Sequence, residues 1–145
     1  MTDREHRTFQ ANGIRVHAVV AGSGPTAVLV HGFPESWYSW RHQIPAIAAA
    51  GYRVVAVDVR GYGRSAKPAR VEDYRMLKHV GDMVGTLDAL EVETATIIGH
   101  DWGAPIAWNS ALLRPDRFTA VAGLSVPYAA PAPASEPAPT ARMRA

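Results

Sequence analysis

The hydrophobic residues divide the chain into short segments of two kinds. Residues 7–11 and 14–21 have the character of β-strands, and the Asn12-Gly13 pair between them is typical of a two-residue hairpin turn. Later segments are nearly unbroken apolar runs, which suit strands of a parallel sheet that is buried on both faces. These runs are residues 26–30, 52–59, 95–98 and 118–126.

Three segments between these strands repeat their hydrophobic residues at helical spacing. The first begins at Trp37, directly after the candidate N-cap Ser36, and Gly51 ends it. The others cover about residues 73–90 and 104–114. Because strands and helices alternate, the sequence predicts an α/β fold with a mainly parallel sheet, an N-terminal antiparallel hairpin and flanking helices.

Composition changes near the end of the chain. Residues 127–145 are rich in proline and alanine and have no periodic apolar face, which is typical of an extended, disordered tail. We therefore expect the ordered part of an α/β core domain to occupy residues 1–126 and the tail to occupy 127–145.

Charge and cysteine content narrow the class of protein. The 145 residues carry a formal charge of +2 with both signs scattered, which argues against a dedicated nucleic-acid surface. Cysteine is absent, the first residues are polar, and no apolar run is long enough to span a bilayer. We expect a cytoplasmic protein with no cofactor, no metal, and neither a nucleic-acid nor a membrane partner.

The strongest candidate for chemistry is the segment 99–103, Gly-His-Asp-Trp-Gly. It follows an apolar strand and precedes a helix, so a sharp turn flanked by glycines would lift Asp101 above the sheet. An ordinary aspartate has a pKa of about 3.9, so its carboxylate is a ready nucleophile that forms an ester. A plain strand-to-helix turn is the alternative, but the small first-turn residues of the next helix favour the nucleophile.

A second loop is expected beside this turn. Residues 31–34, His-Gly-Phe-Pro, follow the strand 26–30 and therefore lie at the same carboxyl edge of the sheet, where open α/β sheets bind ligands. The backbone N–H groups of Phe33 and Trp102 could meet a developing oxyanion, and Trp102 would form a wall of the pocket. The alternative is that this loop is only a tight strand-to-helix connection with no catalytic role.

A third loop resembles a dinucleotide-binding fingerprint without meeting its requirements. Residues 61–66, Gly-Tyr-Gly-Arg-Ser-Ala, follow a strand with suitable glycine spacing. That fingerprint needs a helix that begins among the glycines, to hold a pyrophosphate at its N-terminus. Lys67-Pro68 stands where this helix should run, so we reject a dinucleotide site.

The histidines show no metal-ligand spacing. We expect His6, His17, His42 and His79 to be surface or strand-face residues. His100 is expected to be a packed neighbour of Asp101 and not its base, because adjacent residues on a sharp turn point apart.

Taken together, three motifs resemble the soluble epoxide hydrolases of the α/β-hydrolase fold. They are His-Gly-Phe-Pro-Glu-Ser-Trp-Tyr-Ser-Trp-Arg at 31–41, Asp-Val-Arg-Gly-Tyr-Gly-Arg-Ser at 58–65, and Gly-His-Asp-Trp-Gly-Ala-Pro at 99–105. Their order and spacing match that family, as does Arg-Pro-Asp-Arg at 114–117, and the resemblance covers about residues 6–128.

The resemblance implies a site and a reaction. Asp101 would be the nucleophile, the N–H groups of Phe33 and Trp102 the oxyanion hole, and Trp102, Phe33 and Pro34 the walls of the substrate pocket. It also implies a cis peptide between Phe33 and Pro34 and a structural role for the Arg-Gly-Tyr-Gly loop. A small apolar epoxide would be opened to an ester, which water activated by a histidine would hydrolyse to a diol.

Two related families are separated by single positions. Haloalkane dehalogenases typically carry Asn or Glu after the His-Gly pair, where this chain has Phe33. Fluoroacetate dehalogenases tend to carry Arg after the nucleophile, where this chain has Trp102. Both positions favour an epoxide hydrolase, and a haloalkane dehalogenase-like hydrolase is the remaining family alternative.

In that family a further stretch of about the same length supplies a helical cap with two tyrosines, the general-base histidine and its acidic partner. None of these can be assigned here, and Tyr128 precedes the point where a cap would begin. We therefore expect a truncated chain that does not turn over the ester alone and exposes a sheet edge, open to self-association or a complementing polypeptide. The alternatives are an inactive fragment acting at most through association, and a hydrolase that recruits His31 or His100 as base.

Overall fold

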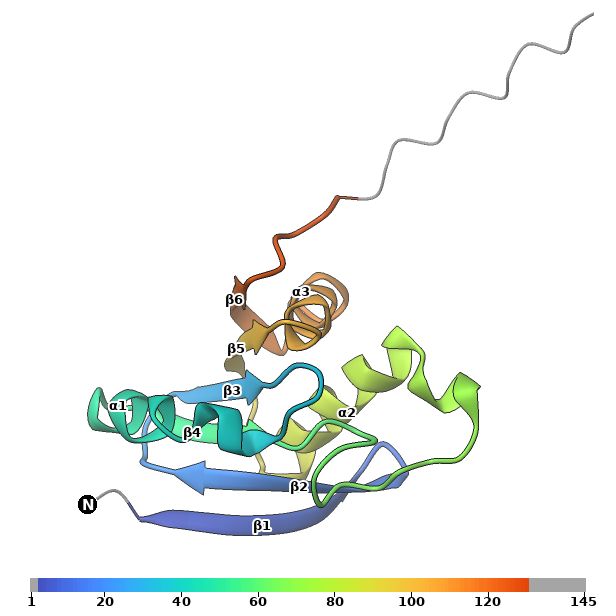
Figure 1. Ribbon diagram of the computed structural model, residues 1–145. Helices are drawn as coiled ribbons and strands as arrows, with labels where there is room; N and C mark the ends of the chain where they lie inside the picture. The colour runs from blue at the N-terminus through green and yellow to red at the C-terminus, as the bar shows by residue number, and fades with distance from the viewer. Residues whose placement is uncertain (1–2, 131–145) are drawn as a thin grey trace, which may run out of the picture.

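The computed structural model describes residues 3–130, which form one six-stranded sheet with helices on both faces (Figure 1). The strand order is β1-β2-β4-β3-β5-β6. The strands are β1 (Arg4–Ala11), β2 (Ile14–Ala21), β3 (Thr26–Val30), β4 (Arg53–Val57), β5 (Ala95–His100) and β6 (Phe118–Leu124). The helices are α1 (Gln43–Ala49), α2 (Met76–Ala89) and α3 (Gly103–Leu113), with short 3₁₀ turns η1 (Trp37–Trp40) and η2 (Val71–Tyr74).

The sheet combines an antiparallel and a parallel part, which confirms the predicted fold class. Strand β1 pairs with β2 across Asn12 and Gly13, whose φ angles of 51° and 78° fit the turn that twists with its strands. Strand β2 then runs antiparallel to β4, whereas β3, β4, β5 and β6 are parallel neighbours. The carboxyl ends of four strands therefore meet at one edge of the sheet.

Both faces of the sheet are covered by apolar side chains. Helices α2 and α3 pack on one face over a core that includes Val28, Val55, Met83, Leu87 and Ile97. Helix α1 covers part of the other face, where Leu29, Trp40, Ile44, Val54 and Ala56 are buried. Burial on both faces explains why these strands have no polar alternation.

Two predicted helices are each divided in the structure. The first becomes η1 and α1. Pro45 has no backbone N–H to donate to the carbonyl oxygen of Arg41, so it is tolerated only in the first turn of a new helix. The helix expected over 73–90 becomes η2 and α2, because Arg75 adopts an extended backbone with ψ 150°. Hydrophobic periodicity continues through both breaks and could not locate them.

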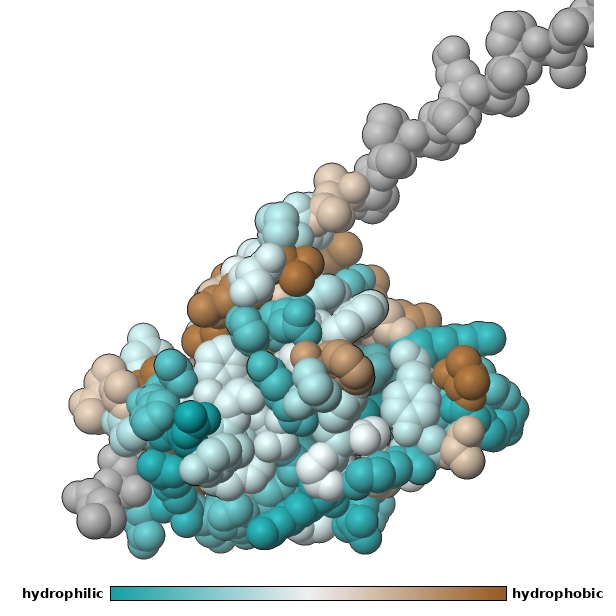
Figure 2. All heavy atoms as spheres, viewed as in Figure 1, coloured by the Kyte–Doolittle hydropathy of each residue, from teal (hydrophilic) through white to brown (hydrophobic). Residues whose placement is uncertain are grey.

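Strand β6 forms one edge of the sheet, and within residues 3–130 its outer side has no pairing strand. Leu124 at its end is 45% exposed, and Figure 2 shows hydrophobic residues gathered at this end of the molecule. Residues 127–130, the start of the predicted tail, have no regular secondary structure, and the rest of that tail lies outside the described residues.

Candidate active site

The turn between β5 and α3 has the geometry of a nucleophile elbow. Asp101 has a φ of +54°, a left-handed conformation that a non-glycine residue seldom adopts. A Cβ atom on Gly103 would lie 2.1 Å from the carbonyl oxygen of Val30, and one on Gly99 would lie 2.0 Å from that of Gly103. Only glycine therefore fits on either side of Asp101, as the motif predicted.

The carboxylate of Asp101 is held by backbone donors. Its Oδ1 atom accepts a hydrogen bond of 2.9 Å from the N–H of Phe33. The N–H groups of Phe33 and then of Trp102 lower the pKa of Asp101 below its ordinary value, so the group is ionised at neutral pH. A Cβ atom on Gly32 would come within 2.4 Å of the Asp101 Cβ, so only glycine lets the two loops approach so closely.

The loop that supplies the Phe33 N–H is fixed by two polar side chains. Glu35 accepts a hydrogen bond of 2.9 Å from the N–H of Gly32 through Oε2. His31 donates from Nδ1 to the Gly32 carbonyl oxygen at 2.8 Å, and its Nε2 atom accepts from the N–H of Val59 at 3.0 Å. The peptide bond between Phe33 and Pro34 is cis, as the resemblance implied.

Neither histidine near the elbow is placed as a base for this aspartate. Both ring nitrogens of His31 are used by backbone groups, and burial lowers the pKa of His31, which keeps the ring neutral. The Nδ1 atom of His100 lies 3.7 Å from Oε2 of Glu35. The expectation that His100 is a neighbour and not the base of Asp101 agrees with this geometry.

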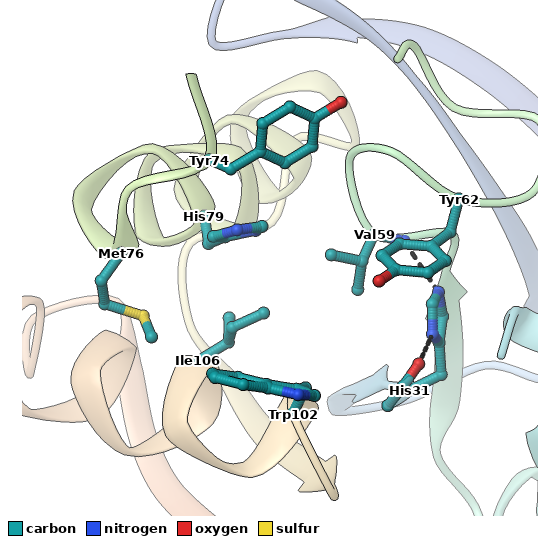
Figure 3. Close-up of a pocket in the computed structure, with 9 residues that line it drawn as sticks. His31, Val59, Tyr62, Tyr74, Met76, His79, Trp102 and Ile106 are labelled. Atoms are coloured by element: carbon teal, nitrogen blue, oxygen red, sulfur yellow. Dashed lines mark hydrogen bonds between the residues drawn. The ribbon is translucent and has the colours of Figure 1, made fainter. Parts of the chain in front are cut away.

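An open cavity of about 230 Å³ lies beside the elbow (Figure 3). Its walls are mainly apolar and aromatic: His31, Gly32, Val59, Tyr62, Tyr74, Met76, His79, Trp102 and Ile106. Of the three residues expected to form the substrate pocket, Trp102 lines this cavity, and Phe33 and Pro34 do not belong to its wall. The Phe33 ring is 60% exposed and packs edge-on against Tyr62, with ring centroids 6.3 Å apart.

Much of this wall was not foreseen. His79 was expected on the surface or on a strand face, but it lies on α2 and faces the cavity with Tyr74 and Met76 (Figure 3). This side of the cavity depends on the break at Arg75, which directs η2 and α2 around the pocket. No local pattern in the sequence marks that contact.

A buried ion pair holds this wall in place. Arg60 donates to both carboxylate oxygens of Asp82 on α2, at 2.7 Å each. Asn12 at the hairpin turn donates to Oδ1 of Asp82 at 3.0 Å, and Arg60 also reaches the carbonyl oxygen of Asp73 at 2.5 Å. The pair therefore ties the first hairpin, the glycine-rich loop and α2 together.

A second aspartate, Asp58, organises the glycine-rich loop. It accepts hydrogen bonds from His17 Nδ1 at 2.7 Å and from the N–H groups of Trp37 and Arg64 at 2.9 Å each. Ser65 donates to the Asp58 carbonyl oxygen at 2.7 Å. These contacts agree with the structural role expected for the loop, and its role explains the glycines without a dinucleotide.

Two further findings concern the part of the chain that the structure describes. No helix there is long and apolar enough to cross a membrane. No group of three or more histidine, cysteine, aspartate or glutamate side chains there is arranged to hold a metal ion.

The elbow, its N–H donors and the six-stranded sheet define a class of protein. The chain belongs to the family of the alpha/beta hydrolase fold, whose model matches residues 25–145. Within that family it is similar to epoxide hydrolases, which confirms the resemblance drawn from the motifs.

Three relatives illustrate this similarity. Epoxide hydrolase B of Mycobacterium tuberculosis is 58% identical over 128 residues, which are 86% of this chain and 36% of that protein. The solved structure of an epoxide hydrolase from an endophytic Streptomyces is 67% identical with a TM-score of 0.86, over 87% of this chain and 38% of its own. The crystal structure of epoxide hydrolase A from Mycobacterium thermoresistibile is 53% identical with a TM-score of 0.84, over 86% of this chain and 40% of its own. The chain therefore spans about 36–40% of the length of these relatives.

Proposed function

We propose that this chain carries the nucleophile, the oxyanion donors and part of the substrate pocket of an epoxide hydrolase. The observation that carries the proposal is the Asp101 carboxylate on its elbow, with Oδ1 bonded to the N–H of Phe33. The apolar and aromatic cavity beside it suits a small apolar epoxide. A serine at the same turn would open an epoxide to a stable ether, whereas an aspartate gives a hydrolysable ester.

The two carboxylate oxygens have different roles in this proposal. Oδ2 attacks an epoxide carbon, the carbon–oxygen bond of the ring breaks, and the alkoxide takes a proton. Oδ1 becomes the carbonyl oxygen of the ester. When water adds to that carbonyl, negative charge develops on Oδ1, where the N–H groups of Phe33 and Trp102 stabilise it, and a diol is released.

A mass-spectrometric experiment tests the first step. The purified chain is incubated with styrene oxide, and peptide mapping locates the adduct while the released diol is quantified. We expect an adduct on Asp101 that is abolished by Asp101→Asn. Asp116 is the matched control, because it is an exposed carboxylate whose pKa is also lowered, here by Arg114. Equal labelling of Asp116 and Asp101 would contradict the proposal.

Hydrolysis of the ester needs a base that activates water. In the described part of the chain, His31 is fully hydrogen-bonded and His100 faces Glu35. We therefore propose that the base and the proton donors come from polypeptide outside residues 3–130, and that the isolated chain accumulates the ester. Sustained diol formation by the isolated chain would overturn this part and favour a local base.

The open edge of β6 suggests how such polypeptide associates. The strand is uncharged, Phe-Thr-Ala-Val-Ala-Gly-Leu, and its exposed edge can pair with another strand from a second copy or a complementing polypeptide. Light scattering at increasing concentration tests self-association, which Ala122→Lys should reduce. Leu112→Lys, an exposed apolar position on α3, is the control. Association without any Asp101 adduct would favour the alternative of an inactive fragment.

A further inference from the structure

Outside the elbow, three titratable side chains form a continuous hydrogen-bonded chain. The buried carboxylate of Asp58 contacts Nδ1 of His17 at 2.7 Å, and Nε2 of His17 contacts Nδ1 of His6 at 2.9 Å. His17 and Asp58 are each 1% exposed, whereas His6 lies at the surface on the edge strand β1. Strands β2, β4 and β3 separate β1 from β5, the strand that precedes Asp101.

The register of the hairpin creates this contact. His17 lies opposite Thr8 and His6 lies opposite Val19, so the two histidines are diagonal neighbours on one face of the β1–β2 pair. Their ring centroids are 5.2 Å apart and the ring planes differ by 21°. The ring of Trp37 packs edge-on against His6 at 5.2 Å and limits its rotation.

The contacts determine where the protons lie when both rings are neutral. A carboxylate can only accept, so Nδ1 of His17 carries a proton and its Nε2 has a lone pair. Nδ1 of His6 must then donate to that lone pair. The remaining lone pair of His6 is on Nε2, the nitrogen that makes no contact within this chain of hydrogen bonds.

We propose that His6 is a surface nucleophile for activated esters, with His17 as its base and Asp58 as a positioning residue. This is the arrangement of nucleophile, base and orienting carboxylate that activates weak nucleophiles in hydrolases. Partial burial lowers the pKa of His6, His17 and Arg64 act in the same direction, and the negative charge of Asp58 opposes them. The His6 ring is therefore neutral, and nucleophilic, at neutral pH.

The reaction balances with water as the only co-reactant. Nε2 of His6 bonds to the acyl carbon, the ester carbon–oxygen bond breaks, and the aryl oxide leaves with its electron pair. The Nδ1 proton of His6 passes to Nε2 of His17, whose positive charge is paired with Asp58. Water then adds to the acyl carbon, the carbon–nitrogen bond breaks, the carboxylic acid leaves, and His17 returns its proton to His6 while one proton enters solvent.

The test uses p-nitrophenyl acetate with the purified chain. Release of p-nitrophenolate is followed by absorbance, and peptide mapping of quenched samples locates the acetyl group. We expect acetylation of His6 to be about 10²-fold faster than that of His42, the lower end of what a positioned base contributes. His42 is the matched control, because it is also exposed and its side chain makes no capping hydrogen bond.

His6→Gln should abolish the fast release, and His42→Gln should leave it unchanged. Equal labelling of the two histidines, or fast release that survives His6→Gln, would overturn the proposal. This outcome is independent of the Asp101 adduct, since a different substrate and a different residue are followed.

The role of His17 needs a measurement that does not depend on a buried substitution. Acetylation of His6 should slow in deuterium oxide, because a proton moves to His17 as the ester is attacked, and acetylation of His42 should not. If deuterium oxide slows the acetylation of His6 and His42 equally, His17 only positions the His6 ring and is not its base. His17→Gln, with its melting temperature measured beside its acetylation rate, then serves as a second check.

Discussion

Asp58 and Asp101 occupy equivalent places, each directly after a parallel strand at the same edge of the sheet. Asp58 is 1% exposed, and a histidine and two backbone N–H groups bind its carboxylate. Asp101 lies between Phe33 and Trp102, which are 60% and 64% exposed, and the N–H of Phe33 is 2.9 Å from Oδ1. The same side chain at the same kind of strand end is thus used for stability at one position and left available for chemistry at the other.

Each aspartate also faces a glycine: Gly63 belongs to the loop that begins at Asp58, and Gly32 belongs to the loop after β3. A Cβ atom on Gly63 would lie 2.2 Å from the Asp58 carboxylate, as one on Gly32 would lie 2.6 Å from Oδ1 of Asp101. In both places a glycine allows the backbone to approach the carboxylate closely. What differs is that the first loop closes over its carboxylate and the second leaves it open.

The largest effect is expected from Asp58→Ala. It leaves the ring of His17 and the N–H groups of Trp37 and Arg64 buried without their acceptor. Removing one member of such a buried network costs about 3–5 kcal/mol of unfolding free energy. Urea unfolding followed by circular dichroism measures it, and Asp101→Ala should leave the midpoint at or above that of the unmodified chain. A loss of similar size in both variants would remove the distinction between the two aspartates.

Alanine substitutions at Gly32 and Gly63, the glycines that face the two aspartates, should also give different results. Gly32→Ala pushes the Asp101 carboxylate from its place, and a displacement of about 1 Å at a reacting group can lower its rate roughly 10²-fold. We expect the rate of styrene oxide adduct formation per folded molecule, measured by mass spectrometry, to fall by about this factor, with a smaller loss of unfolding free energy than Gly63→Ala causes.

Gly63→Ala should show the opposite result. Gly63 has a φ of +51°, where a side chain is strained, and the new methyl group meets Asp58. The unfolding free energy should fall by about 1–3 kcal/mol while the adduct rate per folded molecule is preserved. If Gly63→Ala lowers the adduct rate as much as Gly32→Ala does, the two loops are not independent.

Ser65→Ala is expected to have a moderate effect. The hydroxyl of Ser65 accepts from the N–H of His17 at 2.9 Å and donates to the Asp58 carbonyl oxygen at 2.7 Å. Both partners are buried, so the cost should be about 1–3 kcal/mol in thermal or urea unfolding. Ser39→Ala, at a half-buried position of η1, provides the comparison.

The smallest effect concerns pH. The N–H groups of Phe33 and Trp102 lower the pKa of Asp101, so the carboxylate stays ionised below the ordinary pKa of aspartate. Adduct formation should therefore be constant from neutral pH down through that ordinary value and fall only as the pH drops through the lowered pKa. Rates measured in acidic buffers at constant ionic strength test this. A decline centred at or above the ordinary value would mean that the two N–H groups do not stabilise the anion.

Features that depend only on residues adjacent in the sequence could be predicted from it. The elbow at Asp101 and the turn at Asn12-Gly13 are determined by local backbone demands, and the structure has them where the motifs placed them. The bond between His17 and Asp58 joins residues 41 positions apart, and the wall formed by His79 depends on how α2 crosses the sheet. Such contacts follow from the packing of whole elements and leave no periodic signal. The contact between His6 and His17 is intermediate, since the hairpin register alone brings them together.

The bonds from Asn12 to α2 have a consequence for how the chain folds as it is made. Asn12 donates to the carbonyl oxygen of Lys78 at 3.1 Å and to Asp82 at 3.0 Å, across 66 and 70 residues of chain. A ribosome adds roughly 5–20 residues per second, so the hairpin would emerge several seconds before the helix that anchors it. During that interval the β1–β2 pair has only its own turn and cross-strand contacts to hold it. A hairpin of this kind is marginally stable alone, so protection of its amide hydrogens should arise together with that of α2 and not before it.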